Sequence, residues 1–304
     1  MPDETSATPR LHAIGEAAQI AGFTPETLRV WERRYGRPRA VRLPSGHRRY
    51  TETQVRWLRR VAEALAHGHR PQHVIPLDDA GLDALLAARA PTAPAAAELG
   101  PLLTCVRASR GADLQAALEA HWDPADPVRF LSQWVGPFLR AVGRSWADGE
   151  IGVRHEHLAS EVTMDLLRRL RAGYPPARPG PGVLLTTLAG ERHALGLQMA
   201  ALVCASKGVR GHILGVDTPA GDIAAAAAEL EDIRLVGLSV SLGSGGVDTD
   251  RRLAALREAL PAGIRLVVGG AGARGVRRGP RGVEYAEDLA GWAEALDALP
   301  AVQM

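Results

Sequence analysis

Two stretches rich in proline, alanine and glycine divide this chain of 304 residues and limit how far any one core can extend. The first covers residues 87–97 (AARAPTAPAAA) and the second covers residues 172–182 (AGYPPARPGPG). Because proline and glycine interrupt helices and strands, both stretches are predicted to be linkers. They predict three domains, over residues 1–86, 98–173 and 182–304, and a chain of this length has room for them.

The second and third segments differ in the spacing of their apolar residues. Segments such as DLQAALEA and HLASEVTMDLLRRL, within residues 98–173, repeat at helical spacing and predict a four-helix bundle. After residue 182, short apolar runs at 183–188, 235–242 and 266–268 alternate with alanine-rich helical stretches. That alternation is typical of a parallel sheet covered by helices on both faces, in which ligands bind at the loops that follow the strands. The predicted fold class is therefore multidomain, α and α/β.

Charge is distributed unevenly along the chain. Residues 10–75 hold 13 arginines and 5 glutamates, a net charge of +8, whereas the whole chain has a net charge of +2. A basic module joined to a mildly acidic remainder predicts that the N-terminal part binds nucleic acid.

Location and cysteine chemistry are also constrained by the sequence. No apolar run approaches the roughly 18 residues needed to cross a bilayer, and the first ten residues are polar. We therefore expect a cytoplasmic protein without a membrane partner. Cys105 and Cys204 lie far apart without metal-like spacing, so neither a disulfide framework nor a thiolate metal site is predicted.

The basic module has the pattern of a winged helix-turn-helix. Gly22 and Phe23 end one helical stretch, and Thr24 followed by Pro25 begins the next, with a wing centred on 44–46 further on. The segment LRVWERRYGRPRAVRLPSGHRRYT resembles this domain in the MerR family of transcription regulators, over residues 11–80. Double-stranded operator DNA is the predicted partner. The side chains expected to contact it are Arg29, Arg33, Arg34, Tyr35, Arg42, Arg48 and Arg49.

In the third segment, Glu191, His193 and Gly196 follow the first apolar run. A histidine there can offer one ring nitrogen to a metal while a carboxylate fixes the other nitrogen. The string ERHALG resembles the D-x-H-x-x-G motif of cobalamin-binding domains, with glutamate in place of aspartate, and Leu214-Gly215 is placed after the second strand of that pattern. The resemblance implies a flavodoxin-like (Rossmann-type) domain in which His193 binds cobalt from below. It also implies that Ser239, Gly269 and Gly270 line the slot for the nucleotide tail.

The helical segment carries a further mark, Trp146 followed after nine residues by Glu156 and His157. This W-x9-E-H pattern, together with the domain order, resembles photoreceptors of the CarH/LitR type over nearly the whole chain. The resemblance implies adenosylcobalamin as cofactor. Trp146 would cover its upper face, Glu156 would accept hydrogen bonds from the ribose hydroxyls, and His157 would line the pocket.

One position departs from that family. Its members typically have a histidine directly after the tryptophan, able to bind cobalt once light removes the adenosyl group, and this chain has Ala147. His155 or His157 could take over that role, water could occupy the cobalt, or light could be irrelevant.

These expectations combine into a light-responsive transcriptional regulator, by resemblance a repressor and not an enzyme. It would bind its operator as a homo-oligomer, a dimer or tetramer, in darkness, and leave it when light breaks the cobalt–carbon bond. Two alternatives stay open. One is a MerR-like regulator that senses cobalamin without light, or another tetrapyrrole such as haem or a bilin. The other is a corrinoid methyl carrier, against which the arginine-rich winged helix argues.

Overall fold

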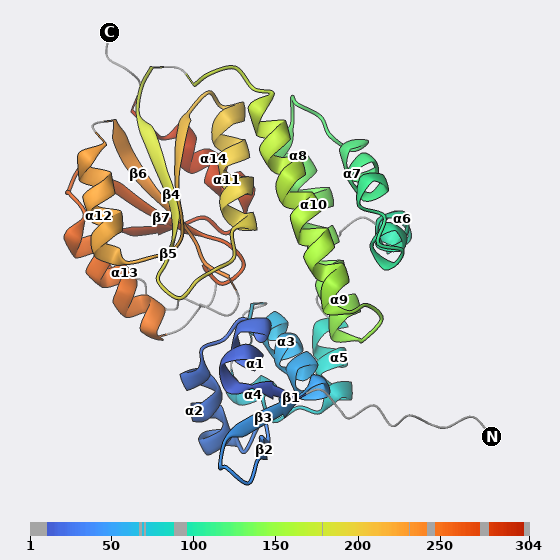
Figure 1. Cartoon of the computed structure of the whole chain (residues 1–304). Coiled ribbons are helices and arrows are strands. Elements are labelled where there is room, and N and C mark those ends of the chain that lie inside the picture. The colour runs from blue at the N-terminus through green and yellow to red at the C-terminus, as the bar shows by residue number, and fades with distance from the viewer. Residues whose placement is uncertain are drawn as a thin grey trace. The chain divides into compact units, whose positions relative to one another are not determined.

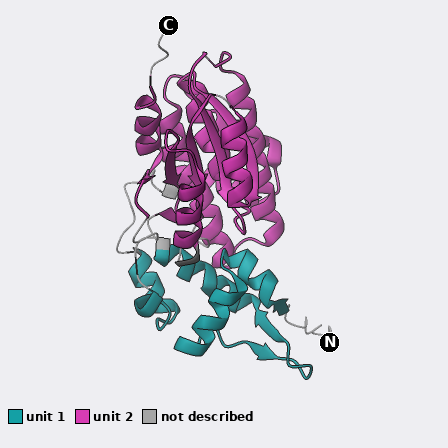
Figure 2. Cartoon of the chain, turned by 90° about the vertical axis from the view of Figure 1, so that its left-hand side faces the viewer, with its two compact units in different colours: residues 1–89 teal, residues 90–304 magenta. Residues whose placement is uncertain are grey.

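The computed structural model describes residues 11–66, 69, 71–87, 96–177, 179–230, 232–241, 247–273 and 280–300. It divides into two compact units, residues 1–89 and 90–304 (Figure 2). Most of the predicted first linker lies outside the described residues. The second, 172–182, connects the last helix of the helical segment to the first strand of the α/β segment, and both segments belong to the second unit. The three domain spans stay a prediction.

The first unit is a small antiparallel sheet surrounded by helices (Figure 1). Its three strands pair in the order β1-β3-β2. The elements are β1 (Leu11–Ala13), α1 (Ile14–Ala21), α2 (Pro25–Tyr35), β2 (Val41–Arg42), β3 (Arg48–Thr51), α3 (Glu52–Ala66), α4 (Pro71–Val74) and α5 (Asp79–Ala87).

The predicted winged helix-turn-helix is confirmed, and local chemistry explains its boundaries. Gly22 adopts a left-handed φ of 75° that ends α1. Thr24 then caps α2, because its Oγ1 accepts a hydrogen bond from the Thr27 backbone N–H at 3.1 Å. Leu28 and Trp31 bury the inner face of α2, and β2 pairs with β3 to form the wing.

The helical part of the second unit comprises four helical segments, as predicted. One of them contains a turn of π-helix, η1, between α8 and α9. Large buried side chains, including Leu118, Phe138 and Leu166, fill the space between the helices. The elements are α6 (Ala96–Arg107), α7 (Gly111–Glu119), α8 (Pro127–Phe130), η1 (Leu131–Val135), α9 (Gly136–Ala147) and α10 (Val153–Ala172).

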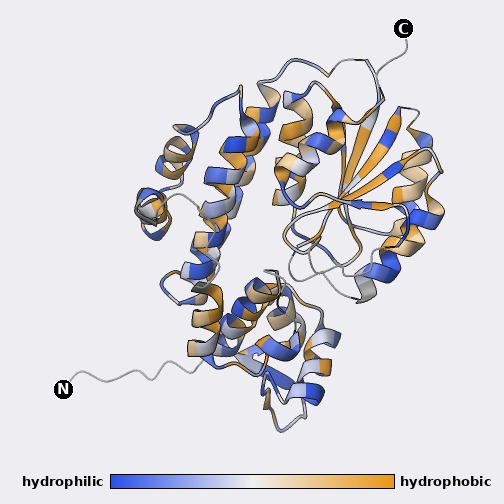
Figure 3. Ribbon diagram, turned by 180° about the vertical axis from the view of Figure 1, so that it is seen from behind, coloured by the Kyte–Doolittle hydropathy of each residue, from blue (hydrophilic) through white to orange (hydrophobic). Residues whose placement is uncertain are grey.

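The α/β part is a five-stranded parallel sheet in the order β5-β4-β6-β7-β8, the strand order of flavodoxin-like folds. Helices α11 and α14 cover one face, and α12 and α13 cover the other (Figure 1). The central strands are strongly apolar because they are buried on both faces (Figure 3). The elements are β4 (Gly182–Leu188), α11 (Leu195–Ser206), β5 (Arg210–Thr218), α12 (Ala220–Glu229), β6 (Ile233–Ser239), α13 (Val247–Ala259), β7 (Arg265–Gly269), β8 (Val283–Tyr285) and α14 (Leu289–Asp297).

Two strand boundaries differ from the prediction. Leu214 and Gly215 were expected after the second strand, but they lie inside β5. Gly215 has a φ of 120°, and the pairing of β4 with β5 shifts register beside it, so the strand continues through an irregularity to Thr218. Strand β6 ends at Ser239, while residue 242, the predicted end, lies outside the described residues. No described helix is long and apolar enough to cross a membrane.

Candidate functional sites

The outer face of α2 presents cationic side chains. Arg29 and Arg33 are exposed on the side away from the buried Leu28 and Trp31, and Arg34 is exposed next to them. Arg29 donates to Glu26 at 2.9 Å, and the Arg34 guanidinium lies 5.4 Å from the ring centre of Tyr35. The helix therefore carries exposed guanidinium groups on its outer face, and their contact with bases or phosphates stays a prediction.

The three predicted arginines of the wing have different surroundings. Arg42 is exposed, whereas Arg49 is half-buried and donates to the carbonyl of Arg48 at 3.1 Å. Arg48 donates through Nε to Glu32 Oε2 at 2.7 Å, so part of its guanidinium joins the wing to α2. Their contact with DNA stays a prediction.

Glu32 is a central acceptor that the sequence did not single out. Besides Arg48, it accepts a hydrogen bond from the hydroxyl of Tyr50 at 2.9 Å. Burial, followed by this hydrogen bond, raises the pKa of Tyr50 well above its usual range, so the phenol stays a donor. The cluster of Glu32, Arg48 and Tyr50 thus fixes the wing against α2.

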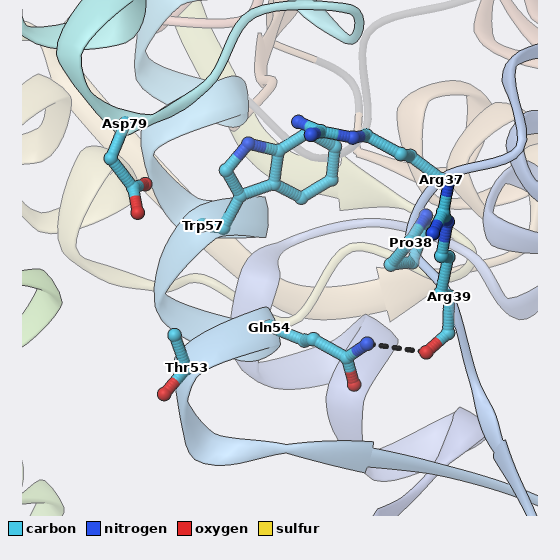
Figure 4. A pocket seen from close by; sticks show the side chains of 7 residues that line it. All are labelled: Arg37, Pro38, Arg39, Thr53, Gln54, Trp57 and Asp79. Atoms are coloured by element: carbon cyan, nitrogen blue, oxygen red, sulfur yellow. Dashed lines mark hydrogen bonds between the residues drawn. The ribbon is translucent and has the colours of Figure 1, made fainter.

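A pocket of about 310 Å³ lies between the loop after α2 and helix α3 (Figure 4). Arg37 lies over the ring of Trp57, 5.7 Å from its centre, and donates to the carbonyl of Leu77 at 2.8 Å. Gln54 donates to the carbonyl of Arg39 while its Oε1 accepts from the backbone N–H of Thr51. These contacts hold the loop that leads from α2 to the wing, which is a structural role.

In the second unit, the loop after β4 holds Glu191 and His193 in a defined pair. Glu191 is buried, and its Oε1 accepts from the backbone N–H of His193 at 2.8 Å and lies 2.6 Å from His193 Nδ1. Donation from Nδ1 to an ionised carboxylate leaves the ring lone pair on Nε2. The imidazole is 59% exposed. His193 can therefore offer Nε2 to a metal ion.

The longer side chain of Glu191, where the cobalamin motif has aspartate, makes a second connection. Its Oε2 accepts from the backbone N–H of Ser241 at 2.9 Å. One carboxylate thus ties the histidine loop to the loop after β6. Both loops follow carboxyl ends of adjacent parallel strands, the edge at which α/β proteins bind ligands.

Several glycines around this edge leave no room for a side chain. A Cβ at Gly196 would lie 2.3 Å from Ser239 Oγ, so these two predicted residues are in direct contact. Gly270 has a φ of 96°, and a Cβ there would lie 2.5 Å from the carbonyl oxygen of Val240. A Cβ at Gly269 meets only ordinary contacts at 3.8 Å. Gly196 and Gly270 thus allow the segments around this edge to pack closely against one another.

The predicted residues of the helical segment lie at the end of α9 and the start of α10. Trp146 is only 3% exposed, and Ala147 is buried beside it. Glu156 lies in the first turn of α10 and accepts from Ser160 at 3.2 Å, while His157 is 71% exposed. The sequence spacing thus places one large indole and one carboxylate on either side of a single turn.

His155 and His157 have different roles in the structure. His155 is buried, and its Nδ1 accepts from the backbone N–H of Gly152 at 2.9 Å. The neutral ring then carries its proton on Nε2, and the side chain serves as the cap of α10. Of the two histidines considered as substitutes at the upper cobalt position, His157 alone is exposed.

The structure adds residues that the sequence interpretation missed. They are Ser241, Gly272, Thr187 and Asp217, all at or beside the loops after β4, β5, β6 and β7. The sequence held a weak signal for Ser241 and Gly272, because each is a small residue two positions after a predicted site residue, Ser239 and Gly270 respectively. Thr187 and Asp217 become recognisable only when β4 and β5 are placed side by side.

Sequence models of known families match each part of the chain. The model of the MerR HTH family regulatory protein matches residues 13–80, and two models of the B12 binding domain match residues 107–171 and 181–302. The structure of the monomethylamine corrinoid protein from Methanosarcina barkeri covers 66% of this chain and 97% of its own, with a TM-score of 0.52 and 16% identity. That likeness concerns the fold.

Two curated relatives extend over most of the chain. The HTH-type transcriptional repressor CarH of Myxococcus xanthus is 33% identical over 276 residues, which cover 87% of this chain and 90% of that protein. The HTH-type transcriptional repressor CarA of the same organism is 30% identical over 265 residues, which cover 86% and 87%. This chain therefore belongs to the CarH-type family of transcriptional regulators, which join a MerR HTH domain to B12 binding domains.

Proposed function

We propose that this protein is a cobalamin-dependent transcriptional repressor that takes adenosylcobalamin and responds to light. The observation that carries the proposal is the pair of Glu191 and His193, whose Nδ1 and Oε1 atoms lie 2.6 Å apart. This pair orients an exposed imidazole with its lone pair on Nε2, the state needed to bind cobalt. The close packing of Gly196 against Ser239 and of Gly270 against Val240 brings together the loops at the strand edge where the nucleotide tail would bind.

The resemblance to CarH-type regulators supports roles for the other cofactor residues. His193 would hold cobalt from below, and Glu191 would maintain the tautomer and ring orientation that this requires. Trp146 would cover the upper face, Glu156 would accept hydrogen bonds from the ribose hydroxyls, and His157 would line the pocket. Bound adenosylcobalamin supplies a cobalt–carbon bond that light breaks, so the photochemistry belongs to the cofactor.

DNA binding is assigned to α2 and the wing. Arg29, Arg33 and the exposed Arg42 would contact operator DNA, while Glu32 keeps the wing in place relative to α2. In darkness the protein would form a homo-oligomer, and several DNA-binding units on one operator raise the overall affinity through multivalency. Loss of the adenosyl group would loosen this assembly and release the DNA.

Replacing Arg33 with alanine is expected to weaken operator binding. A lost phosphate contact lowers affinity for all sequences and reduces the slope of log K against log[salt] by about 1, whereas a lost base contact costs roughly 1–3 kcal/mol at one base pair. Fluorescence anisotropy with operator DNA at several salt concentrations measures both quantities. Arg168→Ala, an exposed arginine on α10, is the control. Equal affinities of Arg33→Ala and the control would show that α2 does not contact the DNA in this way.

Replacing His193 with alanine is expected to lower cobalamin affinity by about 10- to 100-fold or more. Removing only the residue that hydrogen-bonds to a metal-bound histidine already causes a loss of about that size, and His193 is the proposed ligand itself. Equilibrium dialysis with adenosylcobalamin measures the affinity, and the visible spectrum of the bound fraction reports the lower ligand. His73→Ala, on α4 in the first unit, is the control. An unchanged affinity and spectrum in His193→Ala would contradict the assignment of the lower ligand.

The whole proposal is tested by size-exclusion chromatography with the visible spectrum recorded across each peak. The protein is mixed with adenosylcobalamin and examined in darkness and after green light. A larger dark species that carries cobalamin and dissociates on illumination is the expected result. Bound cobalamin without a change in size would overturn the light response and leave a cobalamin sensor. Absence of bound cobalamin would overturn the cofactor and direct attention to haem and bilins.

A further inference from the structure

Asp217, the penultimate residue of β5, makes contacts that converge on the loop holding His193. Its Oδ1 accepts from the backbone N–H of Gly190 at 2.6 Å, and its own N–H donates to the carbonyl of Glu191 at 2.9 Å. Thr187 completes the arrangement, because its Oγ1 accepts from the Asp217 N–H at 2.9 Å and donates to the Glu191 carbonyl at 2.7 Å. Strand β5 thus holds the loop after β4 at two peptide units, one on each side of the Gly190–Glu191 peptide bond.

The backbone of Asp217 is in an uncommon conformation. Its φ is 58°, in the left-handed region that residues with a Cβ seldom adopt, although aspartate and asparagine tolerate it better than most. The side chain is 42% exposed, so packing of a buried side chain does not account for this geometry. The left-handed turn directs both the N–H and the carboxylate of Asp217 toward the neighbouring loop, and it is therefore part of the connection.

We propose that Asp217 is a positioning residue for the cobalt-binding imidazole. It fixes the backbone on both sides of the Gly190–Glu191 peptide bond, and Glu191 in turn orients His193. This inference rests on the proposed function, since it concerns the same histidine. It goes further by assigning a role to Asp217, which is not among the residues of the cobalamin pattern.

The negative charge of Asp217, and not its hydrogen bond to Gly190, is the competing explanation for an effect on the His193 loop. Asp217 Oδ2 lies 3.6 Å from Arg192 Nε, an exposed pair whose contribution to stability is small. Arg192→Ala removes that pair and leaves the backbone contacts in place. Asp217→Asn keeps an acceptor for the Gly190 N–H and tolerates the left-handed φ, but it loses the charge. Asp217→Gly accommodates the φ and loses the acceptor, so it isolates the hydrogen bond.

The test compares the full-length wild type with Asp217→Gly, Asp217→Asn and Arg192→Ala. Hydrogen exchange of residues 189–194 is measured in the cobalamin-free protein. Cobalamin affinity is measured by equilibrium dialysis. Electron paramagnetic resonance of the cob(II)alamin-loaded protein, with histidine labelled by ¹⁵N, reports the fraction of cobalt bound to a protein imidazole.

We expect Asp217→Gly to exchange the amides of 189–194 at least about tenfold faster, as the loss of one hydrogen bond implies. It should also bind cobalamin less tightly and show a smaller fraction of imidazole-bound cobalt. Asp217→Asn and Arg192→Ala should resemble the wild type in all three measurements. Wild-type behaviour of Asp217→Gly, or equal losses in Asp217→Asn, would overturn the positioning role.

The exchange measurement separates this inference from the proposed function. If the wild type binds no cobalamin, the proposed function fails, and exchange in the cobalamin-free protein still decides whether Asp217 holds the loop. If the wild type binds cobalamin through His193 and Asp217→Gly does so equally well, the positioning role alone fails.

Discussion

Replacing Glu32 with alanine is expected to destabilise the DNA-binding unit by about 2–3 kcal/mol, more than any other single change on the surface of α2. Glu32 is 15% exposed and accepts hydrogen bonds from both Arg48 and the fully buried Tyr50. Truncation leaves the Tyr50 hydroxyl buried without its acceptor and removes the partner of a half-buried guanidinium. Since this cluster joins the wing to α2, operator affinity should fall together with stability.

Hydrogen exchange of the full-length protein, analysed over peptides from 25–66, measures this effect locally. Glu26→Ala is the matched control, because Glu26 lies on the same helix and pairs with Arg29 at 2.9 Å but is 67% exposed. Such a surface pair contributes no more than about 1 kcal/mol, so exchange in the control should change little. Glu32→Gln, which retains one acceptor, should lie between the two. Equal exchange in Glu32→Ala and Glu26→Ala would show that the cluster does not hold the wing.

The second large effect is expected at Gly272, in the loop after β7. A Cβ there would lie 1.9 Å from the carbonyl oxygen of Ser241, while the Gly272 N–H donates to the carbonyl of Val240 at 2.9 Å. The two nearest obstacles, the carbonyl oxygen and carbonyl carbon of Ser241, are backbone atoms, so Gly272→Ala can be accommodated only by displacing one of the two loops. Overpacking of this kind costs about 1–3 kcal/mol. Because Ser241 also donates to Glu191, the disturbance reaches the residue that orients His193.

We therefore expect Gly272→Ala to lower cobalamin affinity by roughly 5- to 100-fold, if the strain is relieved by moving the loops. Equilibrium dialysis measures the affinity and thermal unfolding measures the stability of the cobalamin-free protein. Gly263→Ala, at the other end of β7, is the control, since a Cβ at Gly263 meets nothing within 4 Å. Gly269→Ala should also leave the cobalamin-free protein stable, because its nearest contacts are 3.8 Å away. Wild-type affinity in Gly272→Ala would show that the two loops are not packed as described.

Much of the architecture was predictable because local signals there agree with the tertiary fold. The cap at Thr24, the break at Gly22 and the exposed arginines of α2 depend on residues close together in sequence. The continuous apolar runs of β4, β6 and β7 are typical of strands in a sheet that is buried on both faces. By contrast, β5 and β8 lie at the edges of the sheet and are half-exposed, so their sequences lack a continuous apolar run.

In the candidate cofactor site, too, the sequence predicted some features, and the structure was needed for others. Glu191 and His193 are two residues apart, so their spacing alone indicated a carboxylate that orients an imidazole. The sequence spacing of Trp146 and Glu156 likewise marked the turn between α9 and α10, although it did not distinguish the capping role of His155 from the exposure of His157.

Short-range patterns along the chain predict the winged helix-turn-helix, the helical segment, the parallel α/β segment and the histidine loop. The folded structure was needed to show that Arg48 donates to Glu32, that Gly272 packs against Ser241, and that Asp217 holds the loop of His193. Those contacts join residues 16 to 31 positions apart, on elements brought together by strand order and packing. The periodicity of apolar residues along the chain does not predict which of its many polar and small residues will contact one another in the fold.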